Sequence, residues 1–171
     1  MNSDPLLRRM KILIVDDEPA NVALLEEILA ENGYTRFEST TNSKEVLAGC
    51  QQFRPDLVLL DLMMPPPDGF AILDALRSGA NEGFLPIVVL TADTSEETKR
   101  RALEAGATDF LCKPFDHTEV ILRIRNLLET RHVHLLLDNQ RAALEESFRE
   151  RTAELRATIA RLEQKNELQK A

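Results

Sequence analysis

The chain has 171 residues, of which 43% are hydrophobic and 29% are charged, and its formal net charge is −8. This length allows one domain with a proper core plus an appendage, and no apolar run is long enough for a membrane span. The negative charge argues against a nucleic-acid surface. Two cysteines, Cys50 and Cys112, are too few for a disulfide framework, which favours reduced thiols and a cytoplasmic protein.

Short apolar runs and helix-like segments alternate from residue 11 to about residue 130. The runs that are typical of buried strands cover residues 11–15, 36–40, 57–60, 85–90 and 109–112. The segments between them carry helical spacing or capping residues, and helices are expected over about 19–31, 43–52, 69–77, 96–105 and from 117 onward. Five strands that alternate with five helices predict an α/β fold, a doubly wound five-stranded parallel sheet with helices on both faces.

The composition changes after about residue 130. No glycine or proline occurs from Asp116 to Ala171, so nothing obliges the last helix to end. Seven acidic and seven basic side chains alternate over residues 138–170. An apolar stripe with spacings of 4, 7, 4 and 3 runs through the same segment: Leu144, Phe148, Leu155, Ile159 and Leu162. This heptad-like stripe, irregular near its start, predicts a coiled-coil segment over 131–171 that pairs with a second copy or another helix.

Polar residues stand where the expected strands end. Asp16 and Asp17 follow the first strand, and Asp61 ends the third. Thr91 ends the fourth strand and Lys113 follows the fifth. All these strand ends meet at one edge of a parallel sheet, which is the edge where ligands bind.

Three carboxylates in one small cleft repel one another by about 1 to 4 kcal/mol per pair in a surface-like dielectric. A cation is therefore expected, and Mg²⁺ prefers such oxygen ligands. Together with the Lys113 ammonium and the Thr91 hydroxyl, the set predicts a phosphoryl-acceptor site in which Asp61 is the nucleophile.

Each of these residues also has a simpler interpretation. Asp16 and Asp17 could cap the first helix, and Asp61 could be a solvated acid at a strand end. Lys113 could be a surface lysine, and Thr91 could be an ordinary strand residue. The convergence of all five on one edge of the sheet favours the site.

The pattern formed by Asp16-Asp17, Asp61 with Met64-Pro65 and Asp68-Gly69, Thr91-Ala92 and Lys113-Pro114 resembles the receiver domain of bacterial response regulators. The resemblance covers about residues 10–130 and implies a flavodoxin-like (βα)5 fold. It also implies that a sensor histidine kinase phosphorylates Asp61.

The same resemblance implies a role for each residue in binding the metal ion and the phosphoryl group. Mg²⁺ would bind Asp17 directly, Asp16 largely through water, and Met63 through its backbone carbonyl, and Asp61 would belong to the same metal site. Thr91 and Lys113 would contact the phosphoryl group.

Two further expectations concern the switch. The Lys113–Pro114 peptide bond is expected to be cis. Phe110 matches the switch aromatic that moves inward together with Thr91. Because Phe110 lacks the hydroxyl of the tyrosine often found there, its readout is expected to depend on packing alone.

Residues 97–111 and 123–131, with 150–155 in the linker, look like regulators that carry an HD-GYP cyclic di-GMP phosphodiesterase domain. The chain itself contains no HD metal motif, no GYP segment and no helix-turn-helix. The resemblance therefore implies a receiver over 10–130 and a dimerising linker over 131–171, with the output domain outside this chain and no enzyme within it.

Two other functions remain open. The chain could be a stand-alone receiver that acts as an interaction module through its coiled coil. It could also be a phosphatase that uses the Asp61 cluster on external substrates. Haloacid-dehalogenase phosphatases need a second aspartate two positions after the nucleophile, where this chain has Met63, and this difference disfavours the phosphatase.

Overall fold

The computed structural model describes residues 5–79 and 83–170. Contacts within the chain divide it into two units, Met1–Val133 and His134–Ala171. The first unit holds the sheet and the second is helical wherever it is described.

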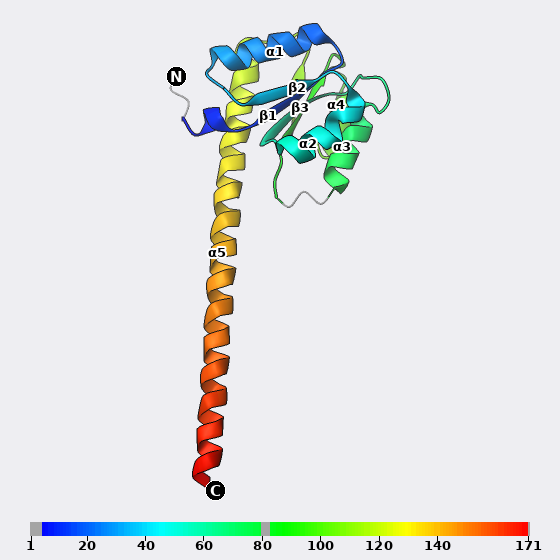
Figure 1. The fold of residues 1–171 in the computed structure, drawn as a ribbon. Coiled ribbons are helices and arrows are strands. Elements are labelled where there is room, and N and C mark those ends of the chain that lie inside the picture. The colour runs from blue at the N-terminus through cyan, green and yellow to red at the C-terminus, as the bar shows by residue number, and fades with distance from the viewer. Residues whose placement is uncertain (1–4, 80–82, 171) are drawn as a thin grey trace. The chain divides into compact units, whose positions relative to one another are not determined.

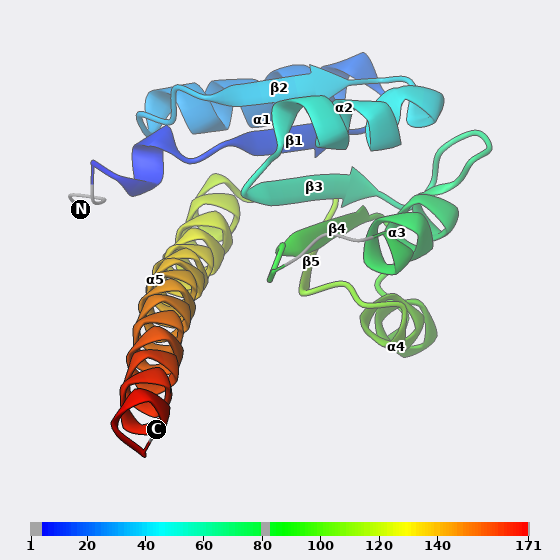
Figure 2. The ribbon, with the colours of Figure 1, turned by 60° about the horizontal axis from the view of Figure 1, so that its bottom comes forward.

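The first unit contains a five-stranded parallel sheet with the strand order β2-β1-β3-β4-β5 (Figure 2). The strands are β1 (Ile12–Val15), β2 (Phe37–Thr40), β3 (Leu57–Asp61), β4 (Ile87–Thr91) and β5 (Asp109–Cys112). The predicted strands are confirmed to within two residues at each end. The fourth strand begins at Ile87, two residues later than predicted, directly after Pro86, which has no N–H for the ladder.

Five α-helices accompany the strands: α1 (Pro19–Glu31), α2 (Val46–Phe53), α3 (Gly69–Ser78), α4 (Glu96–Glu104) and α5 (His117–Lys170). Three of them begin at a side-chain cap. Asp68 accepts the N–H of Ala71 at 2.8 Å at the start of α3. Ser95 caps α4 and Asp116 caps α5 in the same way.

The start of the second predicted helix differs from the expectation. Residues Ser43–Glu45 form a 3₁₀ turn (η2) before α2 begins, and the side chain of Asn42 accepts the N–H of Lys44 there. A second 3₁₀ turn, η1 (Leu7–Arg9), precedes β1 and was not predicted.

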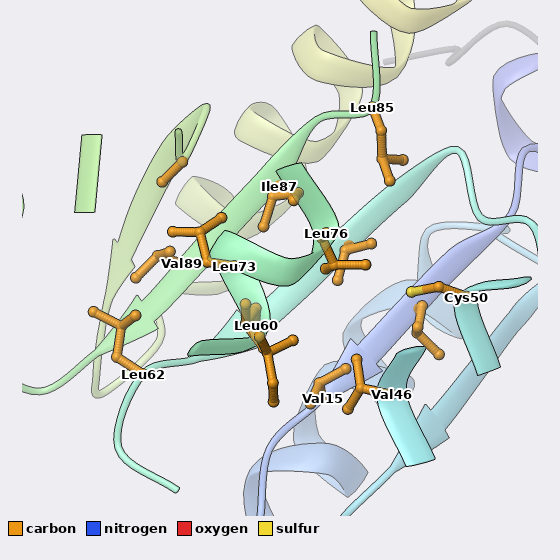
Figure 3. Packing of buried hydrophobic residues seen from close by; sticks show 14 of the residues in the cluster. Val15, Val46, Cys50, Leu60, Leu62, Leu73, Leu76, Leu85, Ile87 and Val89 are labelled. Atoms are coloured by element: carbon orange, nitrogen blue, oxygen red, sulfur yellow. The ribbon is translucent and has the colours of Figure 1, made fainter. Parts of the chain in front are cut away.

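Two apolar layers flank the sheet. One layer lies between the strands and helices α2, α3 and α4, and it contains Leu13, Val15, Val58, Leu60, Ile87 and Val89 from the strands with Val46, Cys50, Ile72, Leu73 and Leu76 from the helices (Figure 3). The alternate strand residues point to the opposite face, because side chains along a strand alternate. The α1 helix lies on that opposite side (Figure 2). Both faces of the sheet are thus covered, which confirms the doubly wound, flavodoxin-like fold.

Helix α5 runs without a break from His117 to Lys170 (Figure 1), as the absence of glycine and proline predicted. In the first unit it buries Val120, Ile124 and Leu128, which are spaced four apart and so share one helix face. Arg131 donates a hydrogen bond to the Phe84 carbonyl at 2.6 Å. These contacts attach the first four turns of α5 to the sheet.

In the second unit the apolar stripe of α5 is exposed. The fractional exposures of its side chains lie between 54 and 73%: Leu144, Phe148, Leu155, Ile159 and Leu162. Most of the stability of a helix in a protein comes from packing of its apolar face against another element. The coiled coil stays a prediction. None of the helices in the described segments combines the length and the apolar content needed to span a bilayer.

Both cysteines are free. Cys50 is a residue of α2, and its side chain lies in the apolar layer between this helix and the sheet. Burial raises the pKa of its thiol to about 11. Cys112 is partly exposed at the end of β5. Cys50 is therefore an uncharged thiol at neutral pH.

Gly69 allows α3 to approach the end of β3 closely, and replacing it tests this contact. A Cβ atom at Gly69 would overlap the carbonyl oxygen of Asp61 and would lie 2.5 Å from the Cα of Leu62. We expect Gly69→Ala to lower the free energy of unfolding by about 1 to 3 kcal/mol, measured by urea denaturation, because the backbone must shift.

Gly49 in α2 provides the matched control, since a Cβ atom there meets nothing within 4 Å. Gly49→Ala should raise the free energy of unfolding by about 0.5 to 1 kcal/mol through its effect on the unfolded chain. Equal stability of Gly69→Ala and the parent would contradict the close approach.

Candidate functional site

The carboxyl ends of two neighbouring strands bring three carboxylates together. Asp16 and Asp17 follow β1, and Asp61 is the last residue of β3, which pairs with β1. One oxygen of each carboxylate lies within 4.8 Å of the others. Asp16 and Asp61 are 0 and 2% exposed, whereas Asp17 is exposed to solvent. The structure thus gathers the three acids that the sequence placed at this edge.

Lys113 is the cation of this cluster. Its Nζ lies 2.7 Å from Asp16 Oδ2 and 2.9 Å from Asp61 Oδ2. Burial lowers the pKa of Lys113, but the hydrogen bonds and charges of Asp16 and Asp61 outweigh burial, and the net pKa is raised. The Lys113 N–H donates to the Thr91 carbonyl at 2.8 Å, and the Lys113–Pro114 bond is cis, as the resemblance implied.

Asp16 is held by the first turn of α1. The Glu18 N–H donates to Asp16 Oδ1 at 2.9 Å. The side-chain amide of Asn21 lies 3.2 Å from both Asp16 oxygens. Sequence reasoning missed Glu18 and Asn21. The only signal for Asn21 was a polar side chain one turn into the helix that follows the strand-end acids.

Asp61 is held more loosely. The Met63 N–H donates to Asp61 Oδ1 at 3.1 Å, and among the described residues the only other polar contact of this carboxylate is the ion pair of Oδ2 with Lys113. The Met63 side chain is 73% exposed beside it. Each oxygen of Asp61 therefore keeps acceptor capacity for another group.

The donor set fits a hard divalent cation. Three carboxylates and one ammonium leave a formal charge of −2 on adjacent groups. Mg²⁺ binds through a few carboxylate oxygens and keeps several waters, so an exposed acid beside two buried acids suits it. The residues present are thus compatible with the Mg²⁺ site that the sequence predicted.

Thr91 lies at the same edge, but its hydroxyl is engaged elsewhere. It donates to the Asp93 carbonyl at 3.3 Å and accepts the Asp93 N–H at 3.0 Å. The Asp93 carboxylate accepts hydrogen bonds from the Thr98 hydroxyl and the Ser95 N–H, and these bonds lower its pKa. The Thr91 hydroxyl thus closes the loop before α4 and makes no hydrogen bond to Asp61.

Phe110 in β5 contacts two cations as well as the apolar layer. The Lys99 ammonium of α4 lies 4.9 Å from the ring centroid, and the Arg123 guanidinium of α5 lies 5.6 Å from it. Arg123 is fixed by Asp109 at 2.7 Å, and this hydrogen bond raises the pKa of Arg123. Cation–π contacts thus join the Phe110 ring to both flanking helices, and the expectation that its readout depends on packing alone stays a prediction.

Comparisons with known proteins agree with this geometry. The family model for the response regulator receiver domain matches residues 12–125. The Escherichia coli transcriptional regulatory protein PcoR is 40% identical over 118 residues, which are 69% of this chain and 51% of PcoR. A Vibrio cholerae protein named "Probable cyclic di-GMP phosphodiesterase" is 31% identical over 149 residues, 87% of this chain and 33% of that protein. This chain therefore spans about half or less of these relatives.

A solved structure shows the same fold. The chemotaxis protein CheY4 of Vibrio cholerae matches with a TM-score of 0.61 and 35% identity, over 67% of this chain and 94% of CheY4.

Replacing Lys113 tests the electrostatic account of this edge. Lys113→Met should lower the free energy of unfolding at pH 7 by about 2 kcal/mol, because two buried carboxylates lose their charged partner. Urea denaturation in EDTA measures the change, and Lys44→Met, at an exposed lysine, is the control.

The pH dependence follows from the raised pKa. The stabilisation by Lys113 is fully present below the ordinary lysine pKa of 10.5 and is lost as the pH rises through the higher folded-state pKa. A parent–variant difference that shrinks between pH 6 and 9 would contradict this account.

Proposed function

Because the chain belongs to the response regulator receiver family, we propose that Asp61 accepts a phosphoryl group from a sensor histidine kinase in a Mg²⁺-dependent reaction. A receiver is the regulatory domain of a two-component response regulator. The observation that carries the proposal is the placement of Lys113 against Asp16 and Asp61 at one edge of the sheet. A nucleophilic carboxylate beside fixed cations is what phosphoryl transfer requires of a protein.

The transfer uses groups that are already in position. An Asp61 oxygen attacks the phosphorus of a phosphohistidine, the phosphorus–nitrogen bond breaks, and its electron pair remains on the histidine. Lys113, 2.9 Å from Asp61 Oδ2, can neutralise an oxygen of the transferred group. Asp17, Asp61 and the Met63 carbonyl would hold Mg²⁺, with Asp16 bound to it largely through water, and the ion would supply the remaining charge neutralisation. Water then attacks the phosphorus of the acyl phosphate, the bond to the Asp61 oxygen breaks, and inorganic phosphate leaves as the carboxylate is restored.

Switching follows from the competition for Thr91. In the structure the Thr91 hydroxyl donates a hydrogen bond to the Asp93 carbonyl. A phosphoryl oxygen on Asp61 would accept this hydrogen bond instead. The loop before α4 then loses one of its closing hydrogen bonds. Phe110 contacts α4 through Lys99 and α5 through Arg123, so a shift of its ring changes both helices. The loop before α4 and Phe110 would then have two arrangements, one for each state of Asp61. A phosphoryl group that favours one arrangement over the other by a few kcal/mol is enough to shift the population.

For the output, we propose a cyclic di-GMP phosphodiesterase domain in the same cytoplasmic protein. The Vibrio cholerae relative aligns over 149 residues, more than the 12–125 segment that the receiver model covers. That alignment therefore includes part of the segment after the receiver.

We also propose that α5 pairs with α5 of a second copy. The apolar stripe from Leu144 to Leu162 is exposed and has no neighbour in the second unit. Burying such side chains contributes about 1.5 to 3 kcal/mol each. A homodimer would cover the stripe on both chains at once.

Phosphorylation can be tested with a small donor. Acetyl phosphate and Mg²⁺ should increase the mass of the parent protein by about 80 daltons, one phosphoryl group. Asp61→Asn should gain no mass, and EDTA should abolish the gain in the parent.

Asp68→Asn is the matched control, because Asp68 caps α3 and lies outside the carboxylate cluster. This variant should be phosphorylated as the parent is. A mass gain in Asp61→Asn, or one that persists in EDTA, would contradict the proposal.

The dimer can be tested in the full chain. Leu155→Asp should convert a dimer to a monomer in sedimentation equilibrium, because it places a charge in the apolar stripe. Ala157→Asp, two residues further on another helix face, should leave the dimer intact. A monomeric parent would refute self-pairing and favour the stand-alone interaction module.

A further inference from the structure

Asn21 links two acidic side chains at the entrance to the carboxylate cluster. Its Nδ2 atom lies 3.2 Å from Asp16 Oδ1, 3.2 Å from Asp16 Oδ2 and 3.3 Å from Glu18 Oε2. Asn21 belongs to the first turn of α1, which begins at Pro19, three residues after Asp16. Its amide is therefore held over the Asp16 carboxylate by the start of the helix.

Three donors already engage the Asp16 carboxylate, and one of them, the Asn21 amide, faces both of its oxygens. A carboxylate offers about four acceptor sites. Oδ1 takes the Glu18 N–H and the Asn21 amide, and Oδ2 takes the Asn21 amide and the Lys113 ammonium. Asp16 is also 0% exposed. A cation that binds Asp16 directly would therefore compete with these donors.

The other two acids of the cluster differ in this respect. Asp61 accepts one contact on each oxygen, from Met63 and from Lys113. The exposed Asp17 side chain accepts no hydrogen bond and forms no ion pair within the described segments. The acids that remain available for direct coordination are thus Asp17 and Asp61.

From this count we infer that Asn21 is a positioning residue that keeps Asp16 out of direct coordination and so makes the site prefer Mg²⁺ over Ca²⁺. The inference rests on the Mg²⁺ site of the proposed function. Mg²⁺ binds through one or two carboxylates and keeps its waters, whereas Ca²⁺ takes six to eight oxygen ligands. Keeping one of the three carboxylates from direct coordination therefore lowers the affinity for Ca²⁺ more than the affinity for Mg²⁺.

The chemistry of the amide matters here. Asn21 is neutral, so it occupies Asp16 without cancelling its charge, and the cluster keeps the formal charge of −2 that attracts a divalent cation. Lys113 also occupies Asp16, but it reduces that charge and contacts Asp61 as well. Asn21 therefore keeps Asp16 from direct contact with the metal ion and leaves the negative charge of the site unchanged.

The experiment measures the affinity of the full chain for Mg²⁺ and for Ca²⁺ by calorimetric titration. Asn21→Asp is nearly isosteric and replaces the donor with a fourth carboxylate. Asn21→Ala removes the donor altogether. Both variants should reduce the ratio of Mg²⁺ to Ca²⁺ affinity at least about tenfold, the usual lower effect of residues that orient metal ligands.

Asn32→Ala is the matched control. Asn32 lies at the other end of α1, where its amide donates to the Ile28 carbonyl at 2.8 Å. Its variant should keep the parent ratio. The shift in unfolding temperature caused by each ion gives a second readout that does not depend on phosphorylation.

The outcomes separate this inference from the proposed function. A parent protein that binds neither ion would overturn the metal site and the role of Asn21 together. A parent that prefers Mg²⁺, with folded Asn21 variants that keep the same preference, would overturn the role of Asn21 alone. If Asn21→Ala unfolds, the isosteric Asn21→Asp decides the matter.

Discussion

The ion pairs of Lys113 with Asp16 and Asp61 are the interaction on which the rest of this structure depends. Two nearly inaccessible carboxylates face one ammonium at 2.7 and 2.9 Å, and the exposed Asp17 carboxylate lies within 4.8 Å of both. Buried charges are tolerated only when they are paired. One lysine pairs with two of the acids and leaves a net negative edge. The paired charges therefore stabilise this edge, and the remaining negative charge is compatible with a divalent cation.

The fold supplies this arrangement through its parallel sheet. Parallel strands end at one edge, so residues 45 positions apart, such as Asp16 and Asp61, become neighbours. Buried layers on both faces hold the strands rigidly, and the missing side chain of Gly69 lets α3 begin directly against the end of β3. The site is thus built from strand ends and first helical turns, which are fixed by packing.

The connection from the site to α5 is polar and aromatic. Thr91 closes the loop before α4 through Asp93, and Phe110 lies between a lysine of α4 and an arginine of α5. Farther along α5, Arg131 is tied to the carbonyl of Phe84. The proposed switch would act through these contacts, which lie outside the apolar layers that hold the sheet together.

The sequence determined the alternation of strands and helices, the placement of Asp61 and Lys113 at strand ends, the cap at Asp68 and the unbroken course of α5. These features depend on residues that are close together in the chain, through periodicity, capping and the absence of helix breakers. Only the tertiary structure decided that Asn21 occupies Asp16, that the Thr91 hydroxyl bonds to Asp93, and that Phe110 contacts two cations.

Even the short-range contacts among these could not be predicted. Asn21 is five residues from Asp16, and Thr91 is two residues from Asp93, yet several donors and acceptors compete for each group. Which of them meet depends on side-chain orientations that the surrounding packing fixes. A pattern of residue types contains the candidates for each hydrogen bond, whereas the folded geometry selects the partner.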